Sequence, residues 1–119
     1  MKDSVIKDKS FAFALRIVKL NQYINETHRE YVLSKQILRS GTSIGANVRE
    51  AGYAQSKKDF LYRMQIALKE ASETEYWLDL LAETGYIEGK MAASLKQDCT
   101  ELLKLLTSCV KSTKNNINN

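Results

Sequence analysis

The stretch SGTSIGANVREA at residues 40–51, together with ASETEYWL at residues 71–78, decides the fold of this chain. Both stretches place polar residues inside strong helical patterns, where a simple bundle of helices would use apolar ones. A lone buried polar group costs roughly 2 kcal/mol or more. We therefore expect these polar residues to be paired. Such pairing would make the contact between the two stretches depend on particular residues and not on apolar packing alone.

Apolar residues recur at helical spacing in four segments, at about residues 4–26, 30–51, 57–84 and 88–111. The third and fourth segments step by three and four residues along a heptad seam. The chain contains no proline, so nothing interrupts long helices. The connections are short, which predicts an all-α, antiparallel up-down four-helix bundle. The two seams are Phe60, Met64, Ala67, Ala71, Thr74, Leu78 and Leu81, and Ala92, Leu95, Cys99, Leu102, Leu106 and Cys109.

Local signals predict where the helices begin and end. Ser56 followed by Asp59 is close to a capping box at the start of the third helix. Gly85 ends that helix, and Gly52 suits a left-handed residue after the second. We expect one domain at residues 1–114 and a frayed tail at residues 115–119, which has no core pattern.

Composition excludes several classes of protein. Cys99 and Cys109 lie about 15 Å apart on one predicted helix, too far for a disulfide within it. They are typical of small core residues in a reducing compartment. No run approaches the ~20 apolar residues of a membrane span, and no signal peptide is indicated. We expect a cytoplasmic protein that has no membrane partner.

The third helix is apolar around well over half its circumference, which favours burial on more than one face. We therefore expect identical copies to close into a homo-oligomeric barrel, with Trp77 and Tyr62 near the interface. A single bundle with one central helix is the alternative. Arg63, Glu70 and Thr74 fall inside the apolar arc, and each needs a partner on another helix or another subunit.

The second helix contains small residues that allow a close approach. Gly41 and Gly45 are four residues apart, a spacing that lets a neighbouring helix come near. Asn47 sits at the edge of the apolar face, and we expect it to bond across the core to Glu73 or Glu75.

Basic residues line the opposite face of that helix. Residues 1–63 contain 12 basic and 6 acidic residues, against 6 and 8 in residues 64–119. The helical spacing brings Lys35, Arg39 and Arg49 onto one face, and Lys57 and Lys58 follow at the start of the third helix. These five residues are candidate contacts for RNA or DNA backbone. A solvated helical face is the alternative. No aromatic residue interleaves the cations, so sequence-specific readout of single strands is not supported.

The chain offers no constellation for catalysis. His28 is its one histidine, so neither zinc spacing nor the Glu-x-x-His pairs of a di-iron bundle exist. No histidine lies near either cysteine in the sequence. We expect a protein that is not an enzyme and uses no cofactor or metal.

The segments SIGANVREA at residues 43–51, SKKDF at 56–60 and IALKEASETEYWL at 66–78 resemble the four-helix-bundle family also called 23S rRNA-intervening sequence proteins. The resemblance covers nearly the whole chain. Many members have proline where this chain has Gly45, so it resembles a glycine-bearing subgroup. The residues that match the family motif at Ser43, Asn47, Glu50 and Glu73 are implied to be structural, and no catalytic residue carries over.

The resemblance implies a homopentameric barrel in a bacterial protein. The similar accessory variability determinant of diversity-generating retroelements implies nucleic acid and a reverse transcriptase as partners. Our first hypothesis is therefore an oligomer that binds RNA or DNA through its basic face. The alternative is a protein-only scaffold or adaptor that binds its partner at the flank around Trp77.

Overall fold

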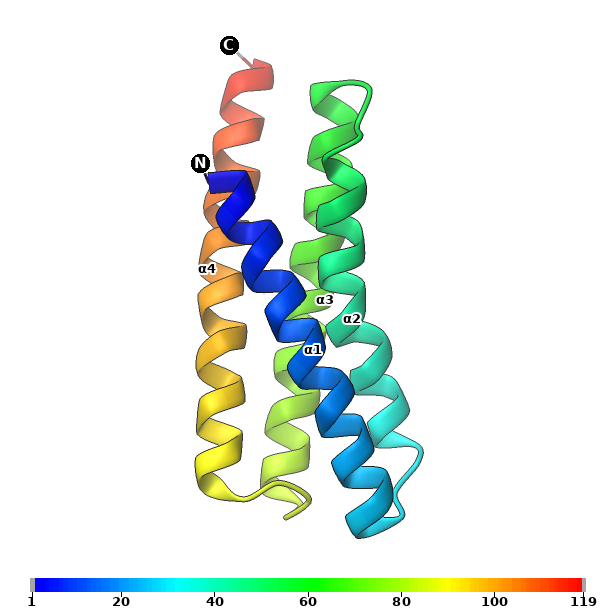
Figure 1. Cartoon of the computed structure of the whole chain (residues 1–119). Helices are drawn as coiled ribbons and strands as arrows, with labels where there is room; N and C mark the ends of the chain where they lie inside the picture. Colours follow the sequence, from blue (N-terminus) through cyan, green and yellow to red (C-terminus); the bar gives the residue numbers. More distant parts are fainter. Residues whose placement is uncertain (1, 119) are drawn as a thin grey trace.

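The computed structural model describes the backbone of residues 2–118 and the side chains of residues 5–118. Within that range the chain forms four helices and no strand. These are α1 (Lys2–His28), α2 (Leu33–Ala51), α3 (Lys57–Glu83) and α4 (Gly89–Asn118). They form an elongated bundle with extents of 50 × 21 × 21 Å (Figure 1). The predicted all-α, antiparallel four-helix bundle is confirmed for one chain.

Each helix packs against two neighbours. α2 and α4 both contact α1 and α3, whereas α1 and α3 lie at opposite corners of the bundle. The start of α1, the end of α2, the start of α3 and the end of α4 therefore share one end of the molecule, at the top of Figure 1. We call this the basic end, because Arg49, Lys57 and Lys58 lie there.

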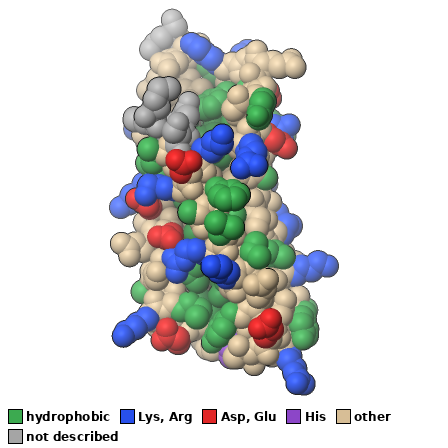
Figure 2. Space-filling view, in the orientation of Figure 1, with side chains coloured by type: hydrophobic (Ala, Val, Ile, Leu, Met, Phe, Trp, Pro, Cys, Tyr) green, Lys and Arg blue, Asp and Glu red, His purple; other side chains and the backbone are tan. Residues whose placement is uncertain are grey.

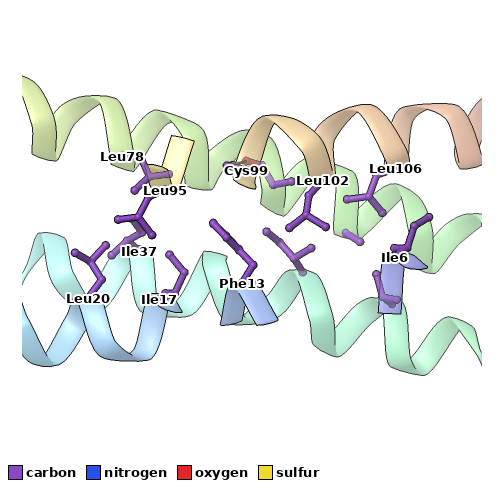
Figure 3. Close-up of a cluster of buried hydrophobic side chains, with 14 of the residues drawn as sticks. Ile6, Phe13, Ile17, Leu20, Ile37, Leu78, Leu95, Cys99, Leu102 and Leu106 are labelled. Carbon is purple, nitrogen blue, oxygen red and sulfur yellow. Dashed lines mark hydrogen bonds between the residues drawn. The ribbon is translucent and has the colours of Figure 1, made fainter. Parts of the chain in front are cut away.

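The buried core contains the two apolar seams that the sequence predicted. Every residue of the α3 seam is buried except Phe60, which is half-buried, and every residue of the α4 seam is buried. Side chains from α1 meet them across the interior (Figure 3). The labelled core residues in that view are Ile6, Phe13, Ile17, Leu20, Ile37, Leu78, Leu95, Cys99, Leu102 and Leu106.

The cysteines belong to this core, as expected. Cys99 and Cys109 are both buried. Burial, together with nearby carboxylates such as Glu75, raises the pKa of Cys99 to about 12. Its thiol therefore stays protonated at neutral pH and lies 3.4 Å from the carbonyl oxygen of Ala71.

Several predicted helix boundaries need correction. α2 begins at Leu33 and not at residue 30, because the Glu30 carboxylate lies before it and accepts hydrogen bonds from the backbone N–H groups of Val32, Leu33 and Ser34. Burial opposes ionisation of Glu30, but these bonds lower its pKa overall. The start of α3 agrees with the prediction, since the Ser56 hydroxyl accepts from the backbone of Asp59 at 3.0 Å.

Of the two glycines predicted to end helices, Gly85 is confirmed and Gly52 turns out differently. Gly52 is not left-handed (φ −63°), because the chain continues in a tight right-handed turn there. The left-handed residues are Arg29 after α1 (φ 52°) and Gly85 after α3 (φ 83°). At the C-terminus the helix continues to Asn118, so residues 115–118 are helical where fraying was expected. Neither glycine nor proline occurs there to end the helix. Residue 119 lies outside the described residues.

The close approach predicted for Gly41 and Gly45 is present, and α1 is the helix that makes it. A Cβ atom at Gly41 would lie 2.8 Å from the side chain of Ile17, and one at Gly45 would lie 3.3 Å from the carbonyl oxygen of Ser10. α1 therefore rests directly on the backbone of α2.

This contact predicts that Gly41→Ala destabilises the protein. Ile17 is fully buried and β-branched, so it has little freedom to move away from a new methyl group. We expect the overpacking to outweigh the gain in helix propensity and to lower the free energy of unfolding by about 1–2 kcal/mol. Urea denaturation followed by circular dichroism measures the change. The control is Gly89→Ala, where no atom lies within 4 Å of the added Cβ; an equal or smaller effect at Gly41 would contradict the close packing.

Candidate nucleic-acid interface

The polar residues of segments 40–51 and 71–78 lie in the contact between α2 and α3. Arg39 of α2 donates one hydrogen bond to Glu70, at 2.7 Å, and another to Glu73, both on α3. The Glu73 carboxylate also accepts from the indole N–H of Trp77 at 3.0 Å. The hydroxyl of Thr74 lies 2.9 Å from that of Ser40 in the buried interior. The buried or half-buried polar residues Ser40, Glu73 and Thr74 of these stretches are thus paired, as predicted.

The partners of the three polar residues in the apolar arc all lie on α2 of the same chain. Arg63 forms a salt bridge with Glu50 at 2.7 Å, Glu70 pairs with Arg39, and Thr74 meets Ser40. The interpretation that each needs a partner on another element is confirmed.

The predicted bond from Asn47 to Glu73 or Glu75 is wrong. The Asn47 amide instead donates to the carbonyl oxygen of Ser43 within α2 at 2.9 Å. Arg39, with its longer side chain, is the residue that reaches Glu73.

The five candidate contact residues do not form one continuous face. Lys35 and Arg39 lie in the first half of α2, toward the end where α1 joins α2. Arg49, Lys57 and Lys58 lie at the basic end, where α2 passes into α3. All five side chains are exposed.

Arg39 is committed to an ion-pair network and contributes no free positive charge. Its guanidinium is shared between two carboxylates, one of which, on Glu70, is only 10% exposed. Hydrogen bonds from Trp77 and then from Arg39 lower the pKa of Glu73. Both carboxylates are therefore held close to a cation that they neutralise, which leaves Arg39 poorly placed to bind phosphate.

The basic end gathers cations that sequence reasoning did not group. Lys7 of α1 lines two cavities together with Arg49 of α2. Beyond Glu101, α4 carries three lysines and no acidic residue, and it ends beside the start of α1 and α3. None of these lysines, nor Lys7, Arg49, Lys57 and Lys58, forms a salt bridge with any side chain of residues 5–118. The three α4 lysines are Lys104, Lys111 and Lys114.

Their grouping follows from the antiparallel order of the helices. Residues far apart in the sequence share this end only because α2 and α4 run toward it while α1 and α3 run away from it. The lack of acidic residues after Glu101 can be seen in the sequence. Only the topology shows that the lysines of this segment lie near Arg49, Lys57 and Lys58.

A stripe of apolar side chains lies exposed on α1. Phe11 and Leu15 are each 51% exposed and Val18 is 39% exposed. Although these residues repeat at helical spacing, they lie outside the buried face of this helix. In Figure 2, hydrophobic side chains gather in the middle of this face with basic side chains above and below. The bundle closes without them, because Ile6, Phe13, Ile17, Leu20 and Ile24 already fill the interior from α1.

The apolar excess of α3 is partly covered within one chain. Phe60, Leu61, Leu68 and Trp77 are half-buried against the core at the seams with neighbouring helices. Tyr62 and Tyr76 remain 58% exposed. Trp77, around which the scaffold hypothesis placed the partner, is therefore less exposed than the stripe on α1, whereas the Tyr76 ring that packs on it is exposed.

No group of three or more His, Cys, Asp and Glu side chains within the described residues is arranged to hold a metal ion. None of the described helices is long and apolar enough to cross a membrane.

Comparison with known proteins agrees with the geometry of the fold. The family model described as 23S rRNA-intervening sequence protein matches residues 2–108. No curated protein matches the chain. A crystal structure of a protein with unknown function from the S23 ribosomal protein family of Bacteroides thetaiotaomicron VPI-5482 is similar, with 58% sequence identity and a TM-score of 0.91. The match covers 93% of this chain and 99% of that one.

The network around Glu73 predicts a pH dependence of stability. Because its pKa is lower in the folded protein than its ordinary value of 4.5, the charged form of Glu73 stabilises the fold above about pH 4.5. That contribution is lost as the pH falls through the folded-state pKa. We expect Glu73→Gln to lower the free energy of unfolding by about 1 kcal/mol at pH 7 and to lose less stability than the wild type on acidification.

Denaturant unfolding at a series of pH values from neutral to acidic measures this difference. Glu83→Gln is the control, since Glu83 is an exposed acid of the same helix with no salt bridge within residues 5–118. Parallel stability curves for the wild type and Glu73→Gln would contradict the role of this network.

Proposed function

The chain belongs to the 23S rRNA-intervening sequence protein family, and we propose that it is a non-enzymatic, oligomeric bundle protein that binds the phosphate backbone of RNA or DNA through its basic end. The observation that carries this proposal is the gathering of Lys7, Arg49, Lys57 and Lys58 at one end without carboxylate partners among residues 5–118. Unpaired lysines and arginines release counterions from nucleic acid when they bind it.

The charge distribution supports this end over the other one. Five of the six acidic residues of α3 follow Lys69 and lie away from the basic end, whereas Asp59 lies in the first turn at that end. The five are Glu70, Glu73, Glu75, Asp79 and Glu83. In α4 the lysines after Glu101 run toward it. A phosphate backbone that approaches the bundle is therefore attracted to one end and repelled by the carboxylates near the other.

The proposed oligomer uses the exposed stripe on α1. Phe11, Leu15 and Val18 are spaced by four and three residues, so they project from one side of that helix. Contiguous exposed apolar side chains are typical of protein–protein interfaces. A second copy of the chain would cover Leu15 and Val18, and a closed ring such as the pentamer that the family resemblance implies would cover both side chains on every subunit.

The binding proposal predicts the effect of removing three cations. We expect the triple variant Arg49→Gln, Lys57→Gln and Lys58→Gln to bind RNA and DNA at least 10-fold more weakly at low salt. The slope of log affinity against log salt concentration should fall by about 2–3, close to one for each phosphate-binding cation that is removed. Fluorescence anisotropy with labelled oligonucleotides, titrated at several salt concentrations, measures both quantities.

The matched control is the triple variant Lys19→Gln, Lys69→Gln and Lys90→Gln. It changes the net charge equally through exposed lysines that lie outside the basic end. We expect it to bind within about threefold of the wild type, since distant exposed charges are screened. Equal losses of affinity in the two triple variants would mean that only net charge matters, and the basic end would lose its role.

The oligomer proposal predicts that Leu15→Glu combined with Val18→Glu lowers the mass in solution to that of one 13.5 kDa chain. Both side chains are exposed in the single bundle, so the helical content and the cooperative unfolding of the chain should persist. Light scattering coupled to size exclusion measures the mass. A wild-type protein that is monomeric at high concentration would overturn the assembly.

A further inference from the structure

We propose that the basic end binds a single strand, with one unstacked base in the cavity beside Tyr53 and the adjoining phosphate on Lys7 and Arg49. This inference rests on the proposed function and names the form of nucleic acid that the site prefers. It is carried by the shape and lining of one cavity, by the exposure of one aromatic side chain and by the position of two cations.

The cavity has a volume of about 320 Å³ and is formed where α1, α2 and α3 meet. Val48, Phe60 and Met64 supply apolar side chains to its lining, while Lys7, Arg49 and Tyr53 supply polar ones. An apolar pocket with a few polar groups is the usual setting for a small planar ligand. A nucleobase has an apolar face and a polar edge and carries a phosphate close by, so it matches both kinds of lining.

Tyr53 is 84% exposed, more than any other large hydrophobic or aromatic side chain among residues 5–118. Nevertheless, the turn that carries it is well anchored. The backbone N–H of Tyr53 donates to the carbonyl oxygen of Glu50 at 3.0 Å, and that of Ala54 donates to Ala51 at 3.1 Å. The ring is therefore presented to solvent by a fixed backbone, which suits stacking against a base.

Lys7 and Arg49 also line a second cavity, of about 390 Å³, between α1 and α2. Phe11 contributes to that cavity, and the Arg49 guanidinium lies 5.7 Å from the centre of its ring. The two cations thus border two hollows, and each hollow has an aromatic residue in its lining. A single strand alternates bases with phosphates in the same way. In a duplex the bases are paired and stacked inside, so none is available to enter either hollow.

This arrangement corrects an inference from the sequence. No aromatic residue interleaves the cations of α2 along the chain, but the fold brings Tyr53 from the following turn and Phe11 from α1 next to Arg49. Stacking of this kind tolerates any base, because every base has a π face. We therefore expect a preference for single strands without a strong preference for sequence.

The test compares a labelled, unstructured 12-nucleotide strand with a 12-base-pair duplex by fluorescence anisotropy at equal salt. Charge alone favours the duplex, because its phosphates are more densely spaced. We expect tighter binding of the strand by the wild type. Tyr53→Ala should weaken strand binding by about 5- to 150-fold, as expected for a stacking contact of 1–3 kcal/mol, and should change duplex binding less than twofold. Tyr53→Phe should keep strand binding within about threefold of the wild type.

Tyr31→Ala is the matched control, since Tyr31 is 59% exposed in the turn between α1 and α2 at the opposite end of the bundle. Both alanine variants should fold, because each removes an exposed ring. If strand and duplex bind equally well, or if Tyr53→Ala binds the strand as the wild type does, this inference is overturned while salt-dependent binding at the basic end still stands. If neither nucleic acid binds, the proposed function fails as well.

Discussion

The bond pattern around Arg39 sets the register between α2 and α3. One guanidinium holds Glu70 and Glu73, while Ser40 and Thr74 meet nearby and Glu50 pairs with Arg63 further along. Sliding one helix past the other would leave several charges and hydroxyls unpaired at a partly buried seam, which is costly even where the pairs add little net stability. The turn at residues 52–56 joins these two helices, and its local hydrogen bonds hold Tyr53 near Arg49.

The same network decides which cations remain free. Because α3 supplies the carboxylates that Arg39 meets, the cations of α2 without a salt bridge to residues 5–118 are Lys35 and Arg49, near its two ends. Antiparallel packing then brings the ends of four helices together. The net charge of the whole chain is only +4, but several of its cations gather at one end. Cations that lie within a Debye length of one another act on the same phosphates.

The sequence predicted the fold because both seams follow one helical period without interruption, and Ser56 and Gly85 mark the limits of α3. It misplaced the start of α2, since Glu30 caps the helix from outside and an acidic residue there also fits a first turn. It grouped Lys35 with Arg49 because helical periodicity reports direction around the helix axis and not position along it. Lys7 escaped it because Lys7 joins Arg49 only through tertiary packing. Tyr53 escaped it because Tyr53 follows Arg49 in a turn that helical periodicity does not describe.

The exposed stripe on α1 and the basic end are linked through one helix. Phe11 is one turn from Lys7, so a subunit that packs on Leu15 and Val18 stands close to the cations without needing to cover them. Copies that close into a ring would repeat the same basic end around one axis. Several weak phosphate contacts then act on one strand. Once one subunit has bound the strand, the basic end of its neighbour meets it at a higher effective concentration than a free subunit would. A site with few cations per chain can in this way hold a long strand, because assembly multiplies contacts that no single bundle provides.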